Sequence, residues 1–426
     1  MKRTIVAAIA LLMFLHLPAA AQVGSGVEVG AGARAMAMAN NHTAIAKDLS
    51  AVYWNPAALA FLPVREFQMS FDGFRIYGTS ELSGPGVTIP PGVKMGDHRD
   101  RIRMSGLGAM TAIPTIQGGL TLAASFDRPN IFDDFTVYTY EQFGETVSLD
   151  GRKYGDLNRW SGSFGIQVAP NIAAGLTLSV LTGTEKSPIY QVITVGGELV
   201  DRDDYYDVEF QHKYLGYAIA LGASFHPSDI LKIGMKVNAY TNLGLRETQF
   251  VGNPDDYYRK RFEDKGRAYI APSGALGVGL TLPWLITTVD LRMTMPYTFV
   301  LPSEDTQRMP DNMQARSFKF GTGLGFEAPL PSAPVVLRAG YSLDEYDLYP
   351  IIHKFQGDRI DWNLLGPGYW PDRNRHTLSA GIAAFSSGIG IELSYAYQTW
   401  ALLNAGGTLR QDYSSHRFMT SFIYRY

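Results

Sequence analysis

Apolar and small or polar side chains alternate residue by residue along much of the chain. The pattern is clearest in 215–225 and 270–282, where large apolar residues are separated by glycine, alanine or serine. A period of two is typical of β-strands. Three stretches without any charge, 104–126, 160–184 and 268–289, are long enough for membrane helices. Each contains a proline and many glycines, so we interpret each of them as two strands joined by a turn.

The alternation predicts fourteen strands of roughly 10 residues, the length that crosses a membrane as a tilted β-strand. Their approximate ranges are 66–78, 101–113, 116–126, 157–168, 172–185, 213–225, 230–243, 269–282, 285–297, 315–328, 334–346, 375–385, 388–400 and 414–426. Short turns, such as those near Pro114 and Pro170, alternate with long polar loops. This alternation is typical of outer-membrane barrels. We therefore predict an all-β transmembrane antiparallel β-barrel, and the even strand number places both termini in the periplasm.

Charged side chains share one face of the predicted strands. On 388–400, Ile389, Ile391 and Leu393 lie on one face and Glu392 on the other. A charge facing lipid at mid-depth costs ~2–4 kcal/mol, so the charged faces should line the lumen. The charged residues that this argument assigns to the lumen are Arg103, Lys232, Lys236, Asp290, Arg292, Lys319, Glu327, Arg338 and Glu392. Many other inward positions are small, which leaves room for water or an internal plug.

The composition removes several classes of function. The chain has 426 residues, a net charge of −3 and no cysteine, so it has no disulfide framework or thiolate zinc site, and nothing suggests nucleic-acid binding. None of the 8 histidines stands in a metal-binding HxxxH or HExxH spacing. There is no nucleotide-binding P-loop and no G-x-S-x-G elbow. We therefore predict a protein that is not an enzyme and needs no cofactor or metal.

The N-terminus has the features of a secretory signal peptide. Lys2 and Arg3 precede an apolar run from Ile5 to Leu17, and 19–21 supply the small residues of a cleavage site. The apolar run of about 13 residues is too short to span a hydrocarbon core of ~30 Å as a helix. We predict cleavage after Ala21 and export of the mature chain.

The segment 22–62 precedes the first strand and does not alternate. It contains Gly-Ala-Arg-Ala at 32–35, then Asp48 and Ser50, and then Asn55-Pro56-Ala57. Together with the signal peptide and fourteen following strands, this run resembles the N-terminal hatch of the FadL/TodX family. Members of that family are long-chain fatty acid and hydrocarbon channels of Gram-negative outer membranes. The resemblance covers essentially the whole chain.

The resemblance implies a signal peptide over 1–21, a hatch or plug in the lumen over 22–62 and a barrel over 63–426. It also implies passive uptake of hydrophobic compounds, with a hatch rearrangement and a lateral opening in the wall. The residues that match the hatch, and so would form the gate, are Asp48, Ser50, Asn55, Pro56 and Ala57. The same residues could equally serve only as a structural plug.

The lumen cations have two possible roles. They could bind the carboxylate head group of a ligand, or they could pair with inward carboxylates and hold the hatch. The candidates for contact with a ligand are Arg103, Lys232, Lys236, Arg292, Lys319 and Arg338.

The expected partners follow from a monomeric barrel in the Gram-negative outer membrane. They are hydrophobic small molecules (a fatty acid, a hydrocarbon or a detergent-like compound), outer-membrane lipid and lipopolysaccharide. The aromatic C-terminal strand, with Phe418, Phe422, Tyr424 and Tyr426 on one face, resembles an assembly signal and implies the barrel-assembly machinery as well. Two other functions stay open. One is an interaction protein of a type IX-like secretion system, and the other is a general porin.

Overall fold

The structure, a computed structural model, describes most of the chain after the N-terminus. The described residues are 27–28, 30–82, 95–115, 118–131, 134–142, 145–195, 198–199, 206–251, 260–270, 272–295, 319–345, 352–355, 370–403 and 409–426. The predicted signal peptide, 1–21, lies outside them.

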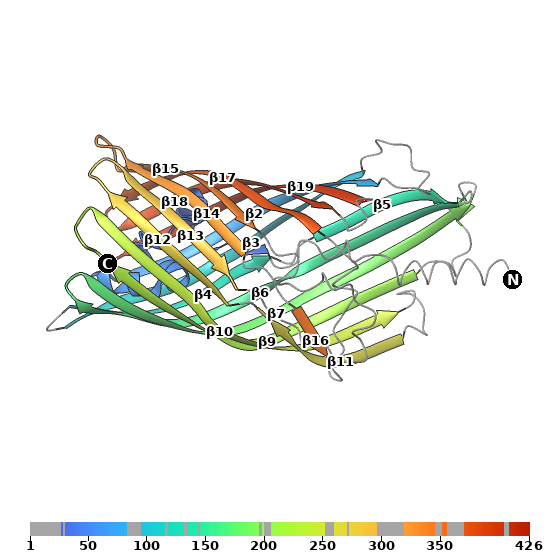
Figure 1. The fold of residues 1–426 in the computed structure, drawn as a ribbon, viewed down its shortest axis with the longest axis horizontal. Coiled ribbons are helices and arrows are strands. Elements are labelled where there is room, and N and C mark those ends of the chain that lie inside the picture. The colour runs from blue at the N-terminus through green and yellow to red at the C-terminus, as the bar shows by residue number, and fades with distance from the viewer. Residues whose placement is uncertain are drawn as a thin grey trace.

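Fourteen antiparallel strands form a closed barrel (Figure 1), as the alternation predicts. In chain order they are β2 (Glu66–Leu82), β3 (Met95–Pro114), β4 (Gly119–Ile131), β6 (Glu145–Ala169), β7 (Ile172–Val195), β9 (Tyr206–Phe225), β10 (Leu231–Val251), β12 (Ser273–Thr281), β13 (Ile286–Thr294), β14 (Lys319–Pro329), β15 (Val335–Glu345), β17 (Trp370–Ser386), β18 (Ile389–Leu403) and β19 (Leu409–Arg425). The last strand, β19, pairs with the first, β2, from Arg425 opposite Glu66 to Leu409 opposite Leu82. Each wall strand therefore has a partner on both sides.

Several predicted loops are partly strands, namely at β5 (Asp134–Gln142), β8 (Glu198–Leu199), β11 (Lys260–Tyr269) and β16 (Ile352–Phe355). A further short strand, β1 (Val27–Glu28), lies in the predicted hatch. β5 pairs with the far end of β6, and β11 pairs with the far end of β10. In Figure 1 these parts extend well beyond the shorter strands β12 to β15.

The period-two pattern misses the far ends of strands such as β9 and β10 because charged or polar residues occur on both of their faces. On β10, beyond the predicted 230–243, the outward Arg246 is exposed while its neighbour Glu247 is buried. On β9, His212 lies just before the predicted 213–225 and is buried between Glu185 and Glu247. A strand that rises out of the lipid no longer needs an apolar outer face, so its sequence looks like that of a loop.

The two faces of the wall strands have the predicted chemistry. On β18, the outward Leu393 is 49% exposed and the inward Glu392 is 1% exposed. The aromatic Phe418 on β19 is 60% exposed, again on the outer face. A continuous apolar outer surface of this kind faces lipid in transmembrane barrels. None of the helices among the described residues is long and apolar enough to cross a membrane.

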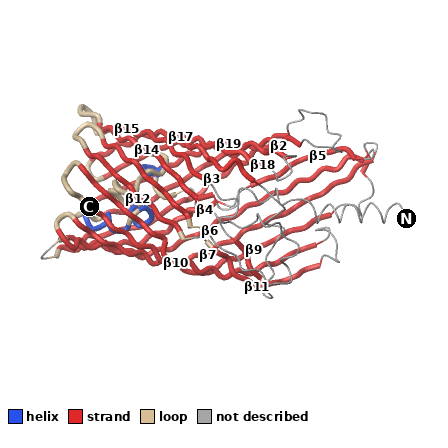
Figure 2. Tube along the Cα trace, viewed as in Figure 1, coloured by secondary structure: helices blue, strands red, loops and turns tan. Residues whose placement is uncertain are grey.

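The segment before β2 folds inside the barrel as three short helical turns. They are α2 (Ala33–Ala37), α3 (Ala51–Trp54) and the 3-10 helix η2 (Pro56–Phe61). α2 contacts β15, β17, β18 and β19, whereas η2 contacts β4, β6, β7 and β9. Figure 2 shows these helices within the barrel, near the end at which the chain terminates. We call residues 30–62 the luminal segment.

The outward position of Leu393 leads to a first prediction. Leu393→Arg places a charge in the apolar outer face and should destabilise the barrel by about 2–4 kcal/mol in a bilayer. The measurement is urea-induced unfolding in phospholipid vesicles. Leu393→Met is the matched control and should change stability by less than about 1.5 kcal/mol, since it conserves volume and polarity. Equal stability of the arginine and methionine variants would contradict a lipid-facing position.

Candidate functional site

The lumen wall has no side chains at several points where the luminal segment passes. A Cβ atom added to Gly175 on β7 would collide with the backbone of Pro56 and Ala57, and one added to Gly340 on β15 would collide with Met38. The small inward residues noted in the sequence therefore let the backbone of the luminal segment lie directly against the wall.

Asn55 fixes the turn between α3 and η2 and ties it to the wall. Its side-chain amide donates to the carbonyl oxygens of Thr43 (3.0 Å) and of Ala223 on β9 (3.1 Å). Its Oδ1 accepts from the Ala57 amide at 3.1 Å, which caps η2, and Pro56 occupies the first turn of that helix. This use of asparagine and proline is favourable at a helix start. The Asn-Pro-Ala motif is thus a buried turn docked on β9.

Asp48 and Ser50 immediately precede α3, and the Leu49 amide between them contacts the first wall strand. Asp48 Oδ1 accepts from the Ser50 amide at 2.9 Å, and the Leu49 amide donates to Glu66 of β2 at 2.7 Å. All five residues of the predicted gate are therefore buried in the luminal segment.

A buried ion network holds α2. Arg34 pairs with Glu327 of β14 at 2.6 Å, and Arg338 of β15 pairs with the same Glu327 at 2.9 Å and with Glu392 of β18 at 2.9 Å. Arg34 also donates to the Ile45 carbonyl at 2.9 Å. Removing one partner of such a network leaves an unpaired buried charge, which is strongly destabilising. The network therefore joins the luminal segment to three wall strands.

Asp290 of β13 holds the middle of the luminal segment through backbone groups. Its Oδ2 accepts from the amides of His42 and Thr43, both at 2.9 Å. Asp290 is one of the inward carboxylates that were predicted as possible partners for lumen cations. In the structure its Oδ2 accepts instead from these two backbone amides.

Tyr53 of α3 lies between two cations from the wall. The guanidinium carbon of Arg159 (β6) is 4.1 Å from the centroid of its ring, and the Lys236 ammonium (β10) is 4.4 Å from it. Cations placed over an aromatic face contribute ~0.5–1 kcal/mol when exposed and ~2 kcal/mol when desolvated. Tyr53 thus fastens the luminal segment to the wall opposite the Arg34 network.

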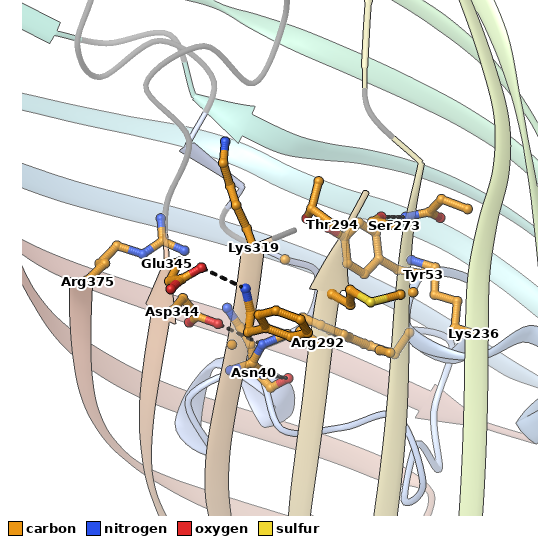
Figure 3. Close-up of a pocket in the computed structure, with 18 residues that line it drawn as sticks. Asn40, Tyr53, Lys236, Ser273, Arg292, Thr294, Lys319, Asp344, Glu345 and Arg375 are labelled. Carbon is orange, nitrogen blue, oxygen red and sulfur yellow. Dashed lines mark hydrogen bonds and ion pairs between the residues drawn. The ribbon is translucent and has the colours of Figure 1, made fainter. Parts of the chain in front are cut away.

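A pocket of about 160 Å³ lies between the luminal segment and the wall. In Figure 3, Tyr53 and Lys236 lie on one side of it, and Asp344, Glu345 and Arg375 on the other. Arg292 projects between the two sides and donates from Nε to Asp344 at 2.8 Å. We call this the polar pocket.

The structure separates the predicted lumen cations into three groups. Lys236, Arg292 and Lys319 line the polar pocket. Arg103 pairs with Asp72 and Asp156, and Arg338 belongs to the network of Arg34. Lys232 is half-buried on β10, one residue from the start of that strand, and does not line the pocket.

Sequence reasoning missed three of the residues that matter most here. Arg34 and Tyr53 lie in the non-alternating segment, where no periodicity says which side chains face the wall. Arg375 stands at the first position of a predicted strand, where the assignment of faces is least certain. For Arg375 the available signal was a cation at a strand end beside predicted lumen charges, and for Arg34 it was its place in the Gly-Ala-Arg-Ala stretch that carries the family resemblance.

Comparison with known proteins gives matches at the level of structure. No protein-family model matches the sequence, and no curated protein matches it. A Pseudomonas aeruginosa FadL homologue is 15% identical, with a TM-score of 0.62 over 94% of this chain and 99% of its own. The Pseudomonas putida toluene transporter TodX is 13% identical, with a TM-score of 0.62 over 94% and 99%. The Ralstonia pickettii toluene transporter TbuX is 12% identical, with a TM-score of 0.56 over 93% and 98%.

The fold and the luminal segment together define a transmembrane β-barrel whose lumen is occupied by its own N-terminal region. Its particular fold is that of the FadL/TodX proteins. The resemblance inferred from the sequence is therefore confirmed at the level of the fold.

The position of Tyr53 predicts how the luminal segment can be loosened. Tyr53→Leu removes the ring between Arg159 and Lys236 and should raise ion conductance through the barrel in planar bilayers several-fold. Tyr53→Phe keeps the ring face and should conduct like the unaltered protein. If the leucine and phenylalanine variants conduct equally, the cation–π contacts do not hold the segment.

His42 predicts a dependence on pH. It is fully buried against Trp54, and neither ring nitrogen has a hydrogen-bond partner among the residues that the structure describes. Burial, followed by the charge of Arg34, lowers its pKa from 6.5 to about 3. The other charged groups acting on it are Asp48, Glu327 and Arg338. Because a released His42 binds a proton more readily than a buried one, docking of the segment should be strongest above pH 6.5 and should weaken as the pH falls toward 3.

The measurement for His42 is protease cleavage of the luminal segment between pH 7 and pH 4. His42→Gln, which cannot titrate, should flatten the change over this range, although Asp48 will add its own dependence at the acidic end. If cleavage depends on pH in the same way in the His42→Gln variant and in the unaltered protein, His42 is not the cause of the pH dependence.

Proposed function

We propose that this protein is an outer-membrane channel for passive uptake of hydrophobic compounds, with the luminal segment as its hatch. The observation that carries the proposal is a lumen filled by a docked N-terminal segment in a barrel with the fold of hydrocarbon channels. Two of the solved proteins of this fold are described as toluene transporters and another, CymD, as a monoaromatic hydrocarbon channel. Fatty acids and hydrocarbons are therefore the candidate substrates.

A filled lumen suits a hydrophobic solute better than a hydrated one. A water-filled pore dissolves an acyl chain poorly, whereas each CH₂ group removed from water contributes about 0.8 kcal/mol. A route along protein surfaces that opens when the hatch rearranges would therefore admit apolar molecules and restrict ions. Movement down a concentration gradient requires no nucleotide.

In this proposed channel the chain has the three parts that the sequence predicts. Residues 1–21 would be removed as a signal peptide, 22–62 would form the hatch, and 63–426 would form the barrel. Both termini would be periplasmic, because the short turns of such barrels are on that side. The gate would include Asp48, Ser50 and Asn55-Pro56-Ala57. The hydrogen bond of the neighbouring Leu49 amide with Glu66 and that of Asn55 with β9 would have to break during opening.

A substrate could pass the hatch either within the lumen or through an opening in the wall. Backbone pairing continues around the fourteen described wall strands. Rearrangement of the hatch within the lumen is therefore the opening that we propose first. A lateral opening, as the family resemblance implies, would require a local loss of this pairing.

The test is uptake into liposomes by the purified mature protein. We expect entry of a long-chain fatty acid and of toluene to be faster than in protein-free liposomes, with little ion conductance. Deletion of residues 22–62 should raise ion conductance strongly, since it empties the lumen. Unaltered uptake relative to protein-free liposomes would overturn the proposal, and co-purification of secretion subunits would then favour the secretion-associated alternative.

A further inference from the structure

The outer face of β19 and β2 turns from apolar to polar partway along both strands. On β19 the outward Phe422 and Phe418 are exposed, and His416 is the next residue on the same face. On β2 the outward Phe71 is exposed, and Arg75 stands four residues further along that face. Because a charge facing lipid within the apolar band is costly, Arg75 and His416 mark one edge of that band.

This edge is the one away from the end of the chain. Tyr424 and Tyr426 mark the opposite edge, where β19 ends, and their ring centroids are 5.5 Å apart. From His416 to Tyr424 the strand rises about 26 Å, or about 20 Å across a bilayer at the usual tilt, which is close to the ~25 Å height of an apolar band. In the orientation proposed above, with the chain terminus in the periplasm, His416 and Arg75 lie at the head groups of the outer leaflet.

Four residues form a row across this edge of the outer face. His416 of β19 lies directly opposite Arg75 of β2 on one side and opposite Tyr397 of β18 on the other, and Arg75 lies opposite Asp100 of β3. Directly opposite side chains of neighbouring strands have Cβ atoms ~4.5–5.5 Å apart. We call these four residues the outer row. It crosses the seam at which the last strand closes the barrel against the first.

The outer row retains hydrogen-bonding groups for a ligand. Among the described residues, the only hydrogen bond of the His416 ring joins its Nδ1 to the Tyr395 hydroxyl at 2.7 Å, which leaves Nε2 for another partner. Arg75 pairs with Asp100 through Nε and Nη2, and its Nη1 donates to the Tyr77 hydroxyl at 3.3 Å. A guanidinium group has five N–H bonds, so Arg75 can also donate to a further acceptor.

Below the outer row the same strands leave a notch in the apolar surface. The next outward position of β2 is Gly73, which lies directly between Phe418 of β19 and Ile102 of β3. Both neighbours project strongly, with 60% of Phe418 and 87% of Ile102 exposed. A Cβ atom built on Gly73 would come no closer than 3.5 Å to the described residues, so the protein itself leaves this space open. An acyl chain that runs along β2 fits between the two apolar side chains.

The chemistry of the outer row fits a phosphate group. A phosphate accepts several charge-assisted hydrogen bonds, and arginine commonly binds it with two N–H groups. The exposed pair of Arg75 and Asp100 contributes little by itself, because water solvates both partners. Asp100 is two strands away from His416, ~10 Å or about one Debye length at ~0.1 M salt, so it repels an anion at His416 only weakly.

We propose that the outer row binds a phosphate group of lipopolysaccharide in the outer leaflet, with an acyl chain of the same molecule in the notch beside Gly73. Arg75 and His416 are the direct partners of the phosphate. The site is on the outside of the barrel and goes beyond the proposed channel function. A lipid held there would bridge the first and last strands at the seam.

The experiment compares lipid A, the acylated and phosphorylated part of lipopolysaccharide, with its dephosphorylated form. Both are titrated onto the full mature chain in maltoside micelles, and bound lipid is counted by native mass spectrometry. We expect the phosphorylated form to bind at least about tenfold more tightly, as charge-assisted hydrogen bonds imply. Equal affinities would overturn the proposal. Displacement of lipid A by an equal concentration of inorganic phosphate would overturn the assignment to a lipid.

Variants locate the binding in the outer row. Arg75→Gln should weaken binding of lipid A about tenfold and leave the dephosphorylated form unchanged. Gly73→Leu fills the notch and should weaken both forms. The matched control is Arg246→Gln, because Arg246 is exposed on the outer face of β10, and it should change neither. The same loss in Arg246→Gln as in Arg75→Gln would contradict the assignment.

A change of opposite sign separates a binding role from a structural one. Asp100→Asn frees Arg75 from its carboxylate and should strengthen binding of lipid A several-fold, without an effect on the dephosphorylated form. If the pair of Arg75 and Asp100 serves only the wall, this variant gains nothing. No gain, or an equal gain for both forms, would therefore contradict the proposal.

Discussion

The ion network of Arg34, Glu327, Arg338 and Glu392 is the interaction on which the architecture of the lumen depends. A barrel wall buries inward charges once a segment of chain fills its interior, and buried charges are stable only when paired. Here the wall supplies two carboxylates, Glu327 and Glu392, and one guanidinium group, that of Arg338. The luminal segment supplies the second guanidinium group, that of Arg34, so that these charges are paired. The pairing ties α2 to the wall, while Asp290, Tyr53 and Asn55 make the contacts that hold the rest of the luminal segment.

The wall is shaped to receive this segment. Glycine at positions such as 175 and 340 removes the side chain where the helical turns pass, so backbone meets backbone. Asn55 donates to the buried carbonyl oxygen of Thr43, and Asp290 accepts from the buried amide of His42. These backbone groups would otherwise be buried without hydrogen bonds.

The strands were predictable because lipid imposes a strict alternation on them. All fourteen predicted wall strands are present, and Glu392 and Leu393 occupy the faces expected of them. The prediction failed where the lipid constraint ends: the far parts of β9 and β10 looked like loops because charged or polar residues occur on both of their faces. Tyr53 escaped notice because its segment has no period, and Arg375 because it stands at the first position of a predicted strand.

The sequence by itself determined the barrel, its lipid-facing surface and the resemblance to the FadL/TodX proteins, because these depend on local alternation and on a contiguous motif. The tertiary structure decided which inward cations are paired and which line a pocket. Arg34 and Glu327 are 293 residues apart, and their contact arises only when the barrel closes around the luminal segment. Charge pairing across a lumen depends on distances in space, and these leave no period in the sequence.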